Sequence, residues 1–232
     1  MRDFFTPKIL GEFSPQGRQS PPFGLKLDSR LAAVVSLVRV GSSVADIGSD
    51  HALLPCFLWQ CGFTDIIATD INPGPLEFAR KTLQKYDATG VQLLQTDGLR
   101  GVPPRDDIII AGLGGETIAK ILADCENAHK KPNSNTRFIL QPMTKHEELR
   151  RGLYRAGFEI LAEIFAVSAK KFYTIIHAKF TGKTCEIDEI FAYIGKQNNP
   201  IYIKNRLEKI QKAAKGNPKF AVLAAEIERK FP

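Results

Sequence analysis

The sequence is poor in the residues that build disulfide frameworks and metal sites, and it has no long apolar run. Its 232 residues include 4 cysteines and 4 histidines. No two cysteines form a CxxC pair and no two histidines have the HExxH spacing, so we expect buried cysteines in a reduced, cytoplasmic protein and no metal site. No apolar stretch approaches the ~18 residues of a membrane span. The first residues lack the apolar core of a secretory signal.

The glycine-rich fingerprint of dinucleotide-binding proteins is also missing. After Gly48 the chain continues with Ser49, Asp50 and His51 rather than with the remaining glycines of GxGxxG. The pattern therefore disfavours NAD as the ligand, because no tight turn for a pyrophosphate is present.

The overall charge points to an anionic partner. The formal net charge is +7 and the isoelectric point is near 9.2, whereas a hydrophobic content of 44% is typical of a globular protein. A basic protein of this kind favours a partner such as nucleic acid.

Composition and periodicity divide the chain into three parts. Residues 1–24 are rich in Pro, Gly, Ser and Gln and predict an irregular leader. Residues 25–181 form the expected main domain, and residues 182–232 a helical region. The main domain opens with a helix inside Leu25–Val40, for which Asp28 is a good N-cap.

Strands and helices then alternate along the main domain. The predicted strands are Ser43–Ile47, Asp65–Thr69, Val91–Gln95, Asp107–Ala111, Arg137–Leu140, Phe158–Val167 and Lys171–Ala178. The predicted helices are Ala52–Cys61, Pro73–Tyr86, Glu116–Cys125 and Lys145–Ala156. Asn72 is expected to cap the second of these helices, and Thr144 with Glu147 forms a capping-box pattern at the last.

The order of elements indicates the fold class. Five strands that alternate with helices require parallel pairing, whereas the last two are joined by Ser168–Lys170 and predict an antiparallel hairpin. This is the strand order of a class I S-adenosylmethionine-dependent methyltransferase: an α/β, Rossmann-like, seven-stranded sheet that ends in an antiparallel hairpin.

The C-terminal region predicts a small helical appendage. Its expected helices are Glu186–Lys196, Ile201–Lys215 and Pro218–Phe231. Ile203, Leu207, Ile210 and Ala214 follow the spacing of a coiled-coil seam, which favours a helical hairpin. Ten Lys or Arg and six Asp or Glu follow residue 182, so Lys204, Arg206, Lys209 and Lys212 are candidate phosphate contacts.

Three acidic residues lie at or just after the ends of three successive strands. Asp46, Asp70 and Asp97 are 24 and 27 residues apart, about one βα unit each, so all three are expected at the same edge of the sheet. This edge is where open α/β sheets bind ligands. An acid near the first turn suits the ammonium of S-adenosylmethionine, one after the second strand suits a ribose diol, and one after the third suits an adenine amino group.

A fourth turn and two polar side chains complete the candidate site. The strand Asp107–Ala111 runs into the glycine-rich stretch Gly112–Gly115, which brings backbone but no side-chain base to the acceptor. That arrangement suits a ring nitrogen with its own lone pair. Asp50 and His51 in the first turn are the candidate catalytic groups. Gln141, at the end of the fifth strand, either contacts a base edge or acts as a cap.

Several segments together resemble the bacterial tRNA (adenine-22-N1)-methyltransferase family. They are Leu27–Leu31, Val44–Ala52, Asp97–Leu99, Ile110–Gly115, Leu140–Pro142 and Glu148–Arg150. The resemblance implies methyl transfer from S-adenosylmethionine to N1 of an adenine in the D-arm region of tRNA, with the tail helping to bind the tRNA. It implies cofactor binding by Gly48, Ser49, Asp50, His51, Asp70, Asp97, Gly98, Ala111, Gly112 and Leu113. Asp46 and Ile71 are further candidates for cofactor binding, and Arg30 and Gln141 are candidate RNA contacts in addition to the tail residues.

The sequence departs from the family pattern at three positions and leaves two alternatives open. Asp70, Leu113 and Met143 stand where the family typically has Glu, Met and Asn, and Met143 removes a polar group near the acceptor. One alternative is a methyltransferase that acts on another RNA or on a small molecule. The other is a non-catalytic RNA-binding protein with a vestigial cofactor pocket. The oligomeric state is not predicted.

Overall fold

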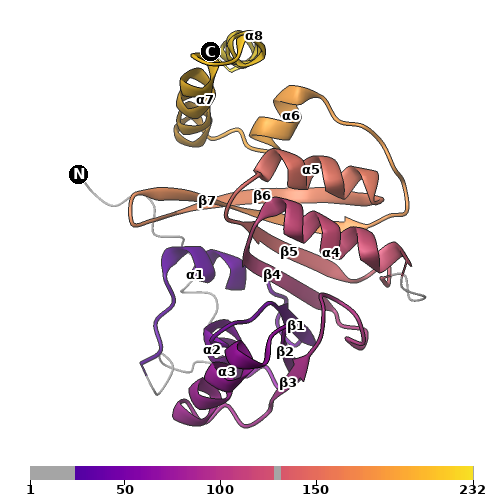
Figure 1. The fold of residues 1–232 in the computed structure, drawn as a ribbon. Coiled ribbons are helices and arrows are strands. Elements are labelled where there is room, and N and C mark those ends of the chain that lie inside the picture. Colours follow the sequence, from indigo (N-terminus) through magenta and orange to yellow (C-terminus); the bar gives the residue numbers. More distant parts are fainter. Residues whose placement is uncertain (1–23, 128–131, 232) are drawn as a thin grey trace. The chain divides into compact units, whose positions relative to one another are not determined.

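The computed structural model describes residues 24–127 and 132–231, and the predicted leader lies outside them, apart from Gly24 (Figure 1). The chain forms two compact units, residues 1–111 and 112–232, which we describe one at a time. Its seven strands follow the hydrogen-bonded order β3-β2-β1-β4-β5-β7-β6. Together with the antiparallel pairing of the last strands, this order confirms the predicted fold class.

The first unit is a parallel sheet covered by helices. Its elements are α1 (Ser29–Val35), β1 (Val44–Ile47), α2 (Leu53–Gln60), β2 (Ile66–Asp70), α3 (Pro73–Lys85), β3 (Val91–Gln95) and most of β4 (Asp107–Leu113). β1 pairs in parallel with both β2 and β4, and β2 pairs in parallel with β3. Every residue of β1 and β2 is buried, as expected for strands with neighbours on both sides.

The register brings the carboxyl ends of these strands to one edge. Ile47 is level with Thr69 on one side and with Ile110 on the other. Asp70 is level with Gln95. The turns that follow β1, β2 and β3 therefore leave the sheet at nearly the same height, as the spacing of the acids predicted.

The second unit contains the antiparallel end of the sheet. Its elements include α4 (Gly115–Asn127), β5 (Arg137–Pro142), α5 (His146–Arg155), β6 (Phe158–Ser168) and β7 (Lys171–Phe180). β7 runs antiparallel to both β5 and β6, and Ser168 pairs with Lys171 across a two-residue turn. Ala169 and Lys170 both have positive φ, which matches the twist of a tight hairpin. The predicted terminal hairpin is thus confirmed.

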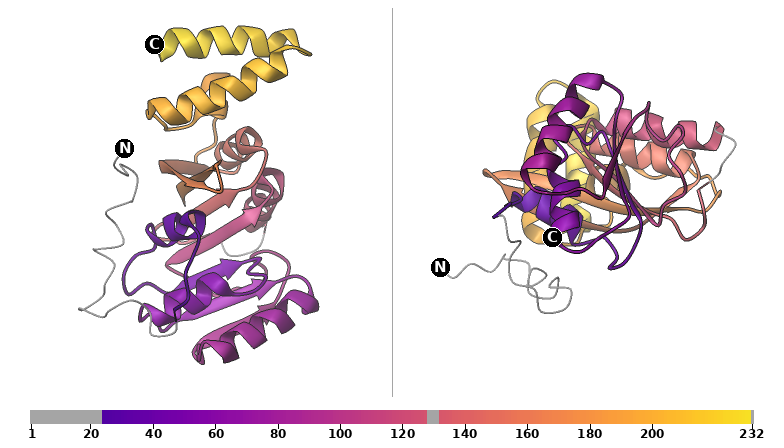
Figure 2. Two further views of the ribbon diagram at one scale, coloured as in Figure 1. Left: turned by 90° about the vertical axis from the view of Figure 1, so that its left-hand side faces the viewer. Right: turned by 90° about the horizontal axis from the view of Figure 1, so that it is seen from below.

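Three helices close the second unit. α6 (Glu189–Ile194) precedes α7 (Pro200–Ala214) and α8 (Pro218–Lys230), and α7 and α8 lie side by side as a hairpin (Figure 2). Ile203 and Ile210 of the predicted seam are buried against Leu223 and Ile227 of α8. The predicted apolar seam of α7 therefore packs against α8.

One capping prediction was wrong, because the Thr144 side chain does not cap α5. α5 begins at His146, and its N-cap is Lys145 with φ 53° and no side-chain capping bond. The carbonyl of Thr144 instead accepts a hydrogen bond from Gly115 N–H at 2.9 Å, which ties this segment to the start of α4.

None of the helices in the described ranges is both long and apolar enough to cross a membrane. Among the same residues, no group of three or more His, Cys, Asp or Glu side chains is arranged to hold a metal ion.

Candidate active site

The turn after β1 has an unusual backbone conformation. Gly48, Asp50 and Ala52 have φ of 73°, 49° and 52°, so three of five consecutive residues occupy the left-handed region. The turn is held to β2, because Ser49 N–H donates to the Thr69 carbonyl at 2.8 Å. Non-glycine residues in this region cost on the order of 1 kcal/mol each and cluster at functional sites. This turn therefore points to a ligand rather than to a simple connection.

Asp46 is a buried carboxylate with a polar but uncharged partner. Its side chain is 5% exposed, and the Ser49 hydroxyl donates to Oδ2 at 2.6 Å. Burial raises the pKa of Asp46 to about 6, although the Ser49 bond acts in the opposite direction. Within the described residues, no cationic side chain lies within 4.0 Å of it. A bound cation would stabilise the ionised form.

Asp70 and Asp97 follow the next two strands. Asp70 is 9% exposed, and its Oδ1 accepts from Asn72 N–H at 3.0 Å. Ile71, directly after it, is 55% exposed and offers an apolar surface beside the acid. Asp97 is exposed, 3.9 Å from Arg100, and is followed by Gly98 with φ 59°. The first unit thus brings Asp46, Asp70 and Asp97 to the ends of three adjacent strands.

The two candidate catalytic side chains are exposed on the same turn. His51 Nε2 lies 3.5 Å from Asp50 Oδ2, with more than half of each side chain accessible. The His51 ring also meets Phe78 of α3 edge-on, with ring centroids 5.3 Å apart. Both groups are therefore accessible to a ligand that approaches the first turn.

The glycine-rich turn after β4 is held by the segment that follows β5. Gly112 is exposed and has φ 82°. The Leu113 carbonyl accepts from Met143 N–H at 2.8 Å. A Cβ on Gly115 would lie 2.2 Å from the Lys145 carbonyl, so only glycine fits there. Gly112 allows the positive φ that this segment requires, and Gly115 allows two backbone segments to pack closely.

Gln141 does not reach the surface. Its side chain is fully buried, with Oε1 accepting from Gly112 N–H at 3.2 Å and Nε2 donating to the Pro142 carbonyl at 2.8 Å. Of the two roles expected for it, the structure supports the cap, and we withdraw it as an RNA contact.

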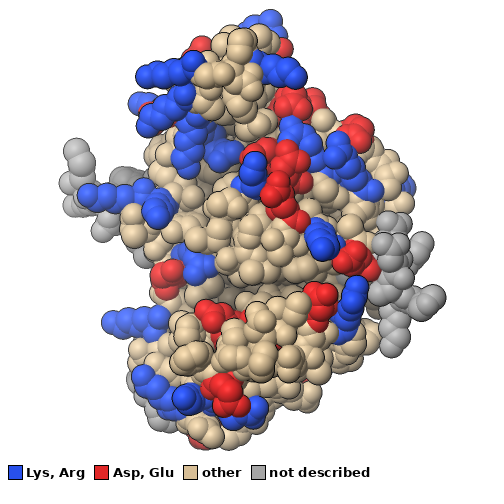
Figure 3. All heavy atoms as spheres, viewed as in Figure 1, with Lys and Arg blue, Asp and Glu red and all other residues tan. Residues whose placement is uncertain are grey.

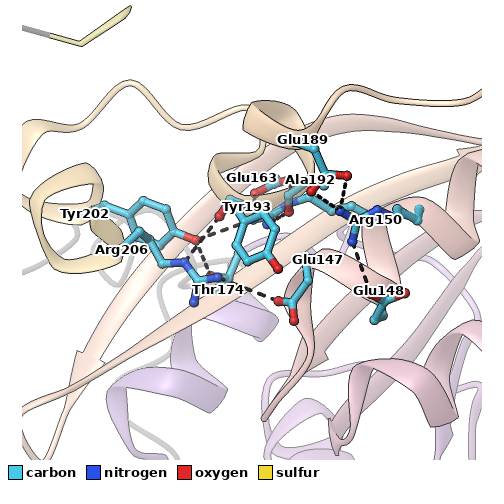
Figure 4. Close-up of polar contacts among 11 residues, drawn as sticks. Glu147, Glu148, Arg150, Glu163, Thr174, Glu189, Ala192, Tyr193, Tyr202 and Arg206 are labelled. Carbon is cyan, nitrogen blue, oxygen red and sulfur yellow. Dashed lines mark hydrogen bonds and ion pairs between the residues drawn. The ribbon is translucent and has the colours of Figure 1, made fainter. Parts of the chain in front are cut away.

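A buried ion pair that the sequence did not predict joins the tail helices to α5 (Figure 4). Arg150 Nε and Nη2 donate to the Glu163 carboxylate at 2.8 and 2.7 Å, and Nη1 donates to the Ala192 carbonyl at 2.7 Å. Tyr202 of α7 contacts Arg150 at 3.4 Å and the Thr174 hydroxyl at 2.9 Å. The sequence signal was weak: a charged residue within the apolar face formed by Leu149 and Leu153.

Arg206 is used inside the second unit rather than kept free for RNA. Its side chain is about one-tenth exposed, with Nε donating to the Tyr193 carbonyl at 3.3 Å and Nη2 3.8 Å from Glu147. Burial, followed by the charges of Arg206, Arg150 and Lys209, lowers the pKa of His146 to about 3. The prediction of a phosphate contact for Arg206 is therefore withdrawn, because its guanidinium is used inside the protein.

The remaining candidate RNA contacts keep accessible charges. Lys204, Lys209 and Lys212 are exposed on α7, and Figure 3 shows lysine and arginine side chains gathered over α7 and α8 at the top of the view. Burial, followed by the charge of Arg206, lowers the pKa of Lys209. In the first unit, Arg30 is half-buried and 3.6 Å from Asp28.

Two sequence comparisons find the same kind of protein. A family model described as a methyltransferase domain matches residues 27–176. The tRNA (adenine(22)-N(1))-methyltransferase of Bacillus subtilis is 30% identical over 199 residues, which cover 81% of this chain and 82% of that protein.

Solved structures agree with the sequence comparisons. The Streptococcus pneumoniae protein Sp1610 in complex with S-adenosyl-L-methionine superimposes with a TM-score of 0.76 at 26% identity, covering 89% of this chain and all of that one. TrmK of M. capricolum in complex with S-adenosyl-homocysteine gives a TM-score of 0.70 at 26% identity, with 88% and 97% covered.

Proposed function

The chain belongs to the tRNA (adenine(22)-N(1))-methyltransferase family, and we propose that the carboxyl ends of β1, β2 and β3 hold its methyl donor. The enzyme transfers a methyl group from S-adenosylmethionine to N1 of adenine 22, in the D-arm region of tRNA. The alternatives of another acceptor and of a non-catalytic RNA-binding protein are not favoured.

The observation that carries the proposed site is that two acids at this edge, Asp46 and Asp70, have no cationic side-chain partner among the described residues. S-adenosylmethionine carries a cationic ammonium, a ribose diol and an adenine amino group, and its sulfonium supplies an electrophilic methyl group. Asp46, with its pKa raised by burial, fits the cation, with Gly48 and Ser49 beside it. Asp70 fits the diol, Asp97 and Gly98 fit the amino group, and the exposed Ile71 fits the adenine face.

The remaining groups face the acceptor. Ala111, Gly112 and Leu113 end β4 and contribute backbone donors and acceptors, since their side chains carry no base. Asp50 and His51 have two proposed roles: they contact the methyl donor, and they act as catalytic groups on the target adenine. Both are accessible for these roles because they are exposed on the strained first turn. Adenine becomes cationic on methylation at N1, so an acceptor for its amino group stabilises the developing charge.

The test of the function is nucleoside analysis of tRNA after incubation with labelled S-adenosylmethionine. We expect label in 1-methyladenosine at position 22, and no label in a transcript that carries guanosine there. Label at another position, or on another base, would contradict the assignment. Full turnover by both Asp50→Asn and His51→Ala would remove the side-chain part of the catalytic proposal.

We assign tRNA backbone contacts to Lys204, Lys209 and Lys212, with Arg30 as a further candidate in the first unit. Replacing the three lysines with Ala should weaken tRNA binding and lower the slope of log K against log salt by about 0.7–0.9 for each lost contact. Removing Lys81, Lys85 and Lys120, which are also exposed but lie on α3 and α4, is the matched control. An unchanged slope in the first variant would exclude the α7 lysines from the interface.

A further inference from the structure

Gln141 is a buried amide whose two ends are both bound within the second unit. Oε1 accepts the Gly112 N–H at 3.2 Å, and Nε2 donates to the Pro142 carbonyl at 2.8 Å and lies 3.7 Å from Met143 Sδ. A fully buried amide is stable only when its polar groups are bound in this way. Its position at the end of β5 therefore serves the turn after β4.

The glycine-rich segment Gly112–Gly115, at the end of β4 and the start of α4, is tied to the end of β5 and the residues after it at three points. Two of them use backbone only: Met143 N–H to the Leu113 carbonyl and Gly115 N–H to the Thr144 carbonyl, at 2.8 and 2.9 Å. The third, at Gly112, is made by the side chain of Gln141. Gly112 is exposed and has φ 82°. Because a glycine backbone is conformationally free, the orientation of its peptide depends on the hydrogen bond from Gly112 N–H to Gln141.

Fixing the Gly112 N–H also fixes the carbonyl of the same peptide. A trans peptide is planar, and its C=O points opposite to its N–H; all peptides of the described chain are trans. When Gly112 N–H points to Gln141, the Ala111 carbonyl is directed away from Gln141. The side chain thus sets the direction of a carbonyl at the end of β4.

We propose that Gln141 is a positioning residue for methyl transfer, which holds the Ala111–Gly112 peptide so that its carbonyl accepts the amino group of the target adenine. The inference rests on the proposed function. Methylation at N1 makes the amino group a stronger donor, and an acceptor that is already oriented needs no rearrangement as the charge develops. Gln141 acts through this peptide and does not touch the base.

The test combines an enzyme variant with a modified substrate. Gln141→Met keeps the approximate shape of the side chain but removes both polar ends. With adenine-22 tRNA we expect kcat to fall about 10- to 100-fold, as for loss of one oriented acceptor, with KM for tRNA and Kd for S-adenosylmethionine nearly unchanged. With purine-22 tRNA, which lacks the 6-amino group, the variant and the wild type should have equal kcat.

The same substitution at Gln197 is the matched control, because Gln197 is 7% exposed and lies in the same unit. Gln197→Met should leave kcat close to that of the wild type. An equal loss in both variants, a Gln141→Met loss that persists with purine-22 tRNA, or a change confined to KM would each overturn the proposal. Absence of 1-methyladenosine from the wild-type reaction would instead overturn the proposed function.

A measurement on the wild type keeps the proposal testable if Gln141→Met does not fold. The Gly112 amide should exchange with solvent slowly, although the residue is exposed, because its N–H is bound to Gln141. Hydrogen exchange followed by NMR reports this amide directly. Exchange at the rate of an unprotected amide would show that Gln141 does not hold the peptide, and the proposal would fail.

Discussion

The carboxylates at the two edges of the first unit's sheet differ in their hydrogen-bond and ion-pair partners. At the amino edge, Asp107 is fully buried and accepts from Arg39 N–H at 2.7 Å, from Arg39 Nε at 2.8 Å and from the Ser42 hydroxyl at 3.1 Å. Beside it, hydrogen bonds from Ser43 lower the pKa of Asp106. Each of these carboxylates has an ionic or amide partner, and these bonds tie the segment Arg39–Ser43 to the start of β4.

At the carboxyl edge, Asp46 is almost as deeply buried but has only the Ser49 hydroxyl as its described side-chain partner. Its pKa is raised to about 6, and the adjoining turn contains two non-glycine residues with positive φ. We therefore expect the amino edge to stabilise the fold, and we propose that the carboxyl edge, where no described cationic side chain pairs with Asp46 and the backbone is strained, binds a ligand. Stability and binding should therefore respond to different residues.

The largest effect is expected from breaking the amino edge. Asp107→Ala removes a fully buried carboxylate and leaves the Arg39 N–H and the Ser42 hydroxyl without this acceptor, while the Arg39 side chain is 31% exposed and can be solvated. This change should lower the free energy of unfolding by about 3 kcal/mol. Urea denaturation measures this loss. The folded fraction should still bind S-adenosylmethionine with the wild-type Kd. A large loss of affinity without a loss of stability would contradict the division between the two edges.

The converse variant is Asp70→Ala. Losing two charge-assisted hydrogen bonds to a ribose should weaken S-adenosylmethionine binding by about 3 kcal/mol, or roughly 100-fold in Kd. Because Asp70 has no cationic partner in the described chain, unfolding should change by less than about 1 kcal/mol. Asp70→Glu is the control and should retain most of the affinity in titration calorimetry. Equal affinity in Asp70→Ala and wild type would remove Asp70 from the site.

The burial of Asp46 should make the free energy of unfolding depend on pH. A raised pKa means that the folded state without ligand loses stability as the pH rises from about 4 through 6. Asp46→Asn should therefore increase the free energy of unfolding near neutral pH, on the order of 2 kcal/mol, and flatten this pH dependence. Denaturation of both proteins between about pH 4 and 8 tests it. Parallel curves for variant and wild type would show that Asp46 is not strained by burial.

The same group predicts the pH dependence of binding. The ammonium of the methyl donor favours the carboxylate, so wild-type affinity should rise as the pH increases through about 6. Asp46→Asn should bind weakly, without that dependence. Calorimetric titrations at several pH values give the comparison, and a dependence retained by the variant would assign it to another group.

The smallest expected effect concerns the strained turn. Ala52 has φ 52°, so Ala52→Gly should relieve strain and stabilise the protein by about 1 kcal/mol. Ala33→Gly, inside α1, is the matched control and should destabilise by about 1 kcal/mol. Thermal denaturation of the pair checks the sign. Destabilisation by both substitutions would mean that the turn is not strained at Ala52.

The sequence predicted the elements and their order because burial in a parallel sheet leaves a clear pattern. Val91–Gln95 was predicted with the observed bounds, and the other strands with ends within two residues. The spacing of Asp46, Asp70 and Asp97 predicted their common edge, since one βα unit returns the chain to it. Asp28 was correctly identified as the cap of α1.

Contacts between distant residues could not be read from the sequence. Gln141 and Gly112 are 29 positions apart, and Arg39 and Asp107 are 68 apart. Arg206 looked like an exposed tail cation, because no local pattern shows that Glu147 and the Tyr193 carbonyl hold it. Thr144 matched a capping box, but its carbonyl is used by α4 and the helix begins two residues later.

The most direct test of the claim that the carboxyl edge holds the methyl donor is a crystal structure of the wild-type protein with S-adenosylhomocysteine. The account predicts the ribose hydroxyls within hydrogen-bond distance of the Asp70 carboxylate and the amino-acid end of the ligand at Gly48 and Ser49. A ligand seated away from the ends of β1 and β2, with Asp70 contacting only Asn72, would contradict it.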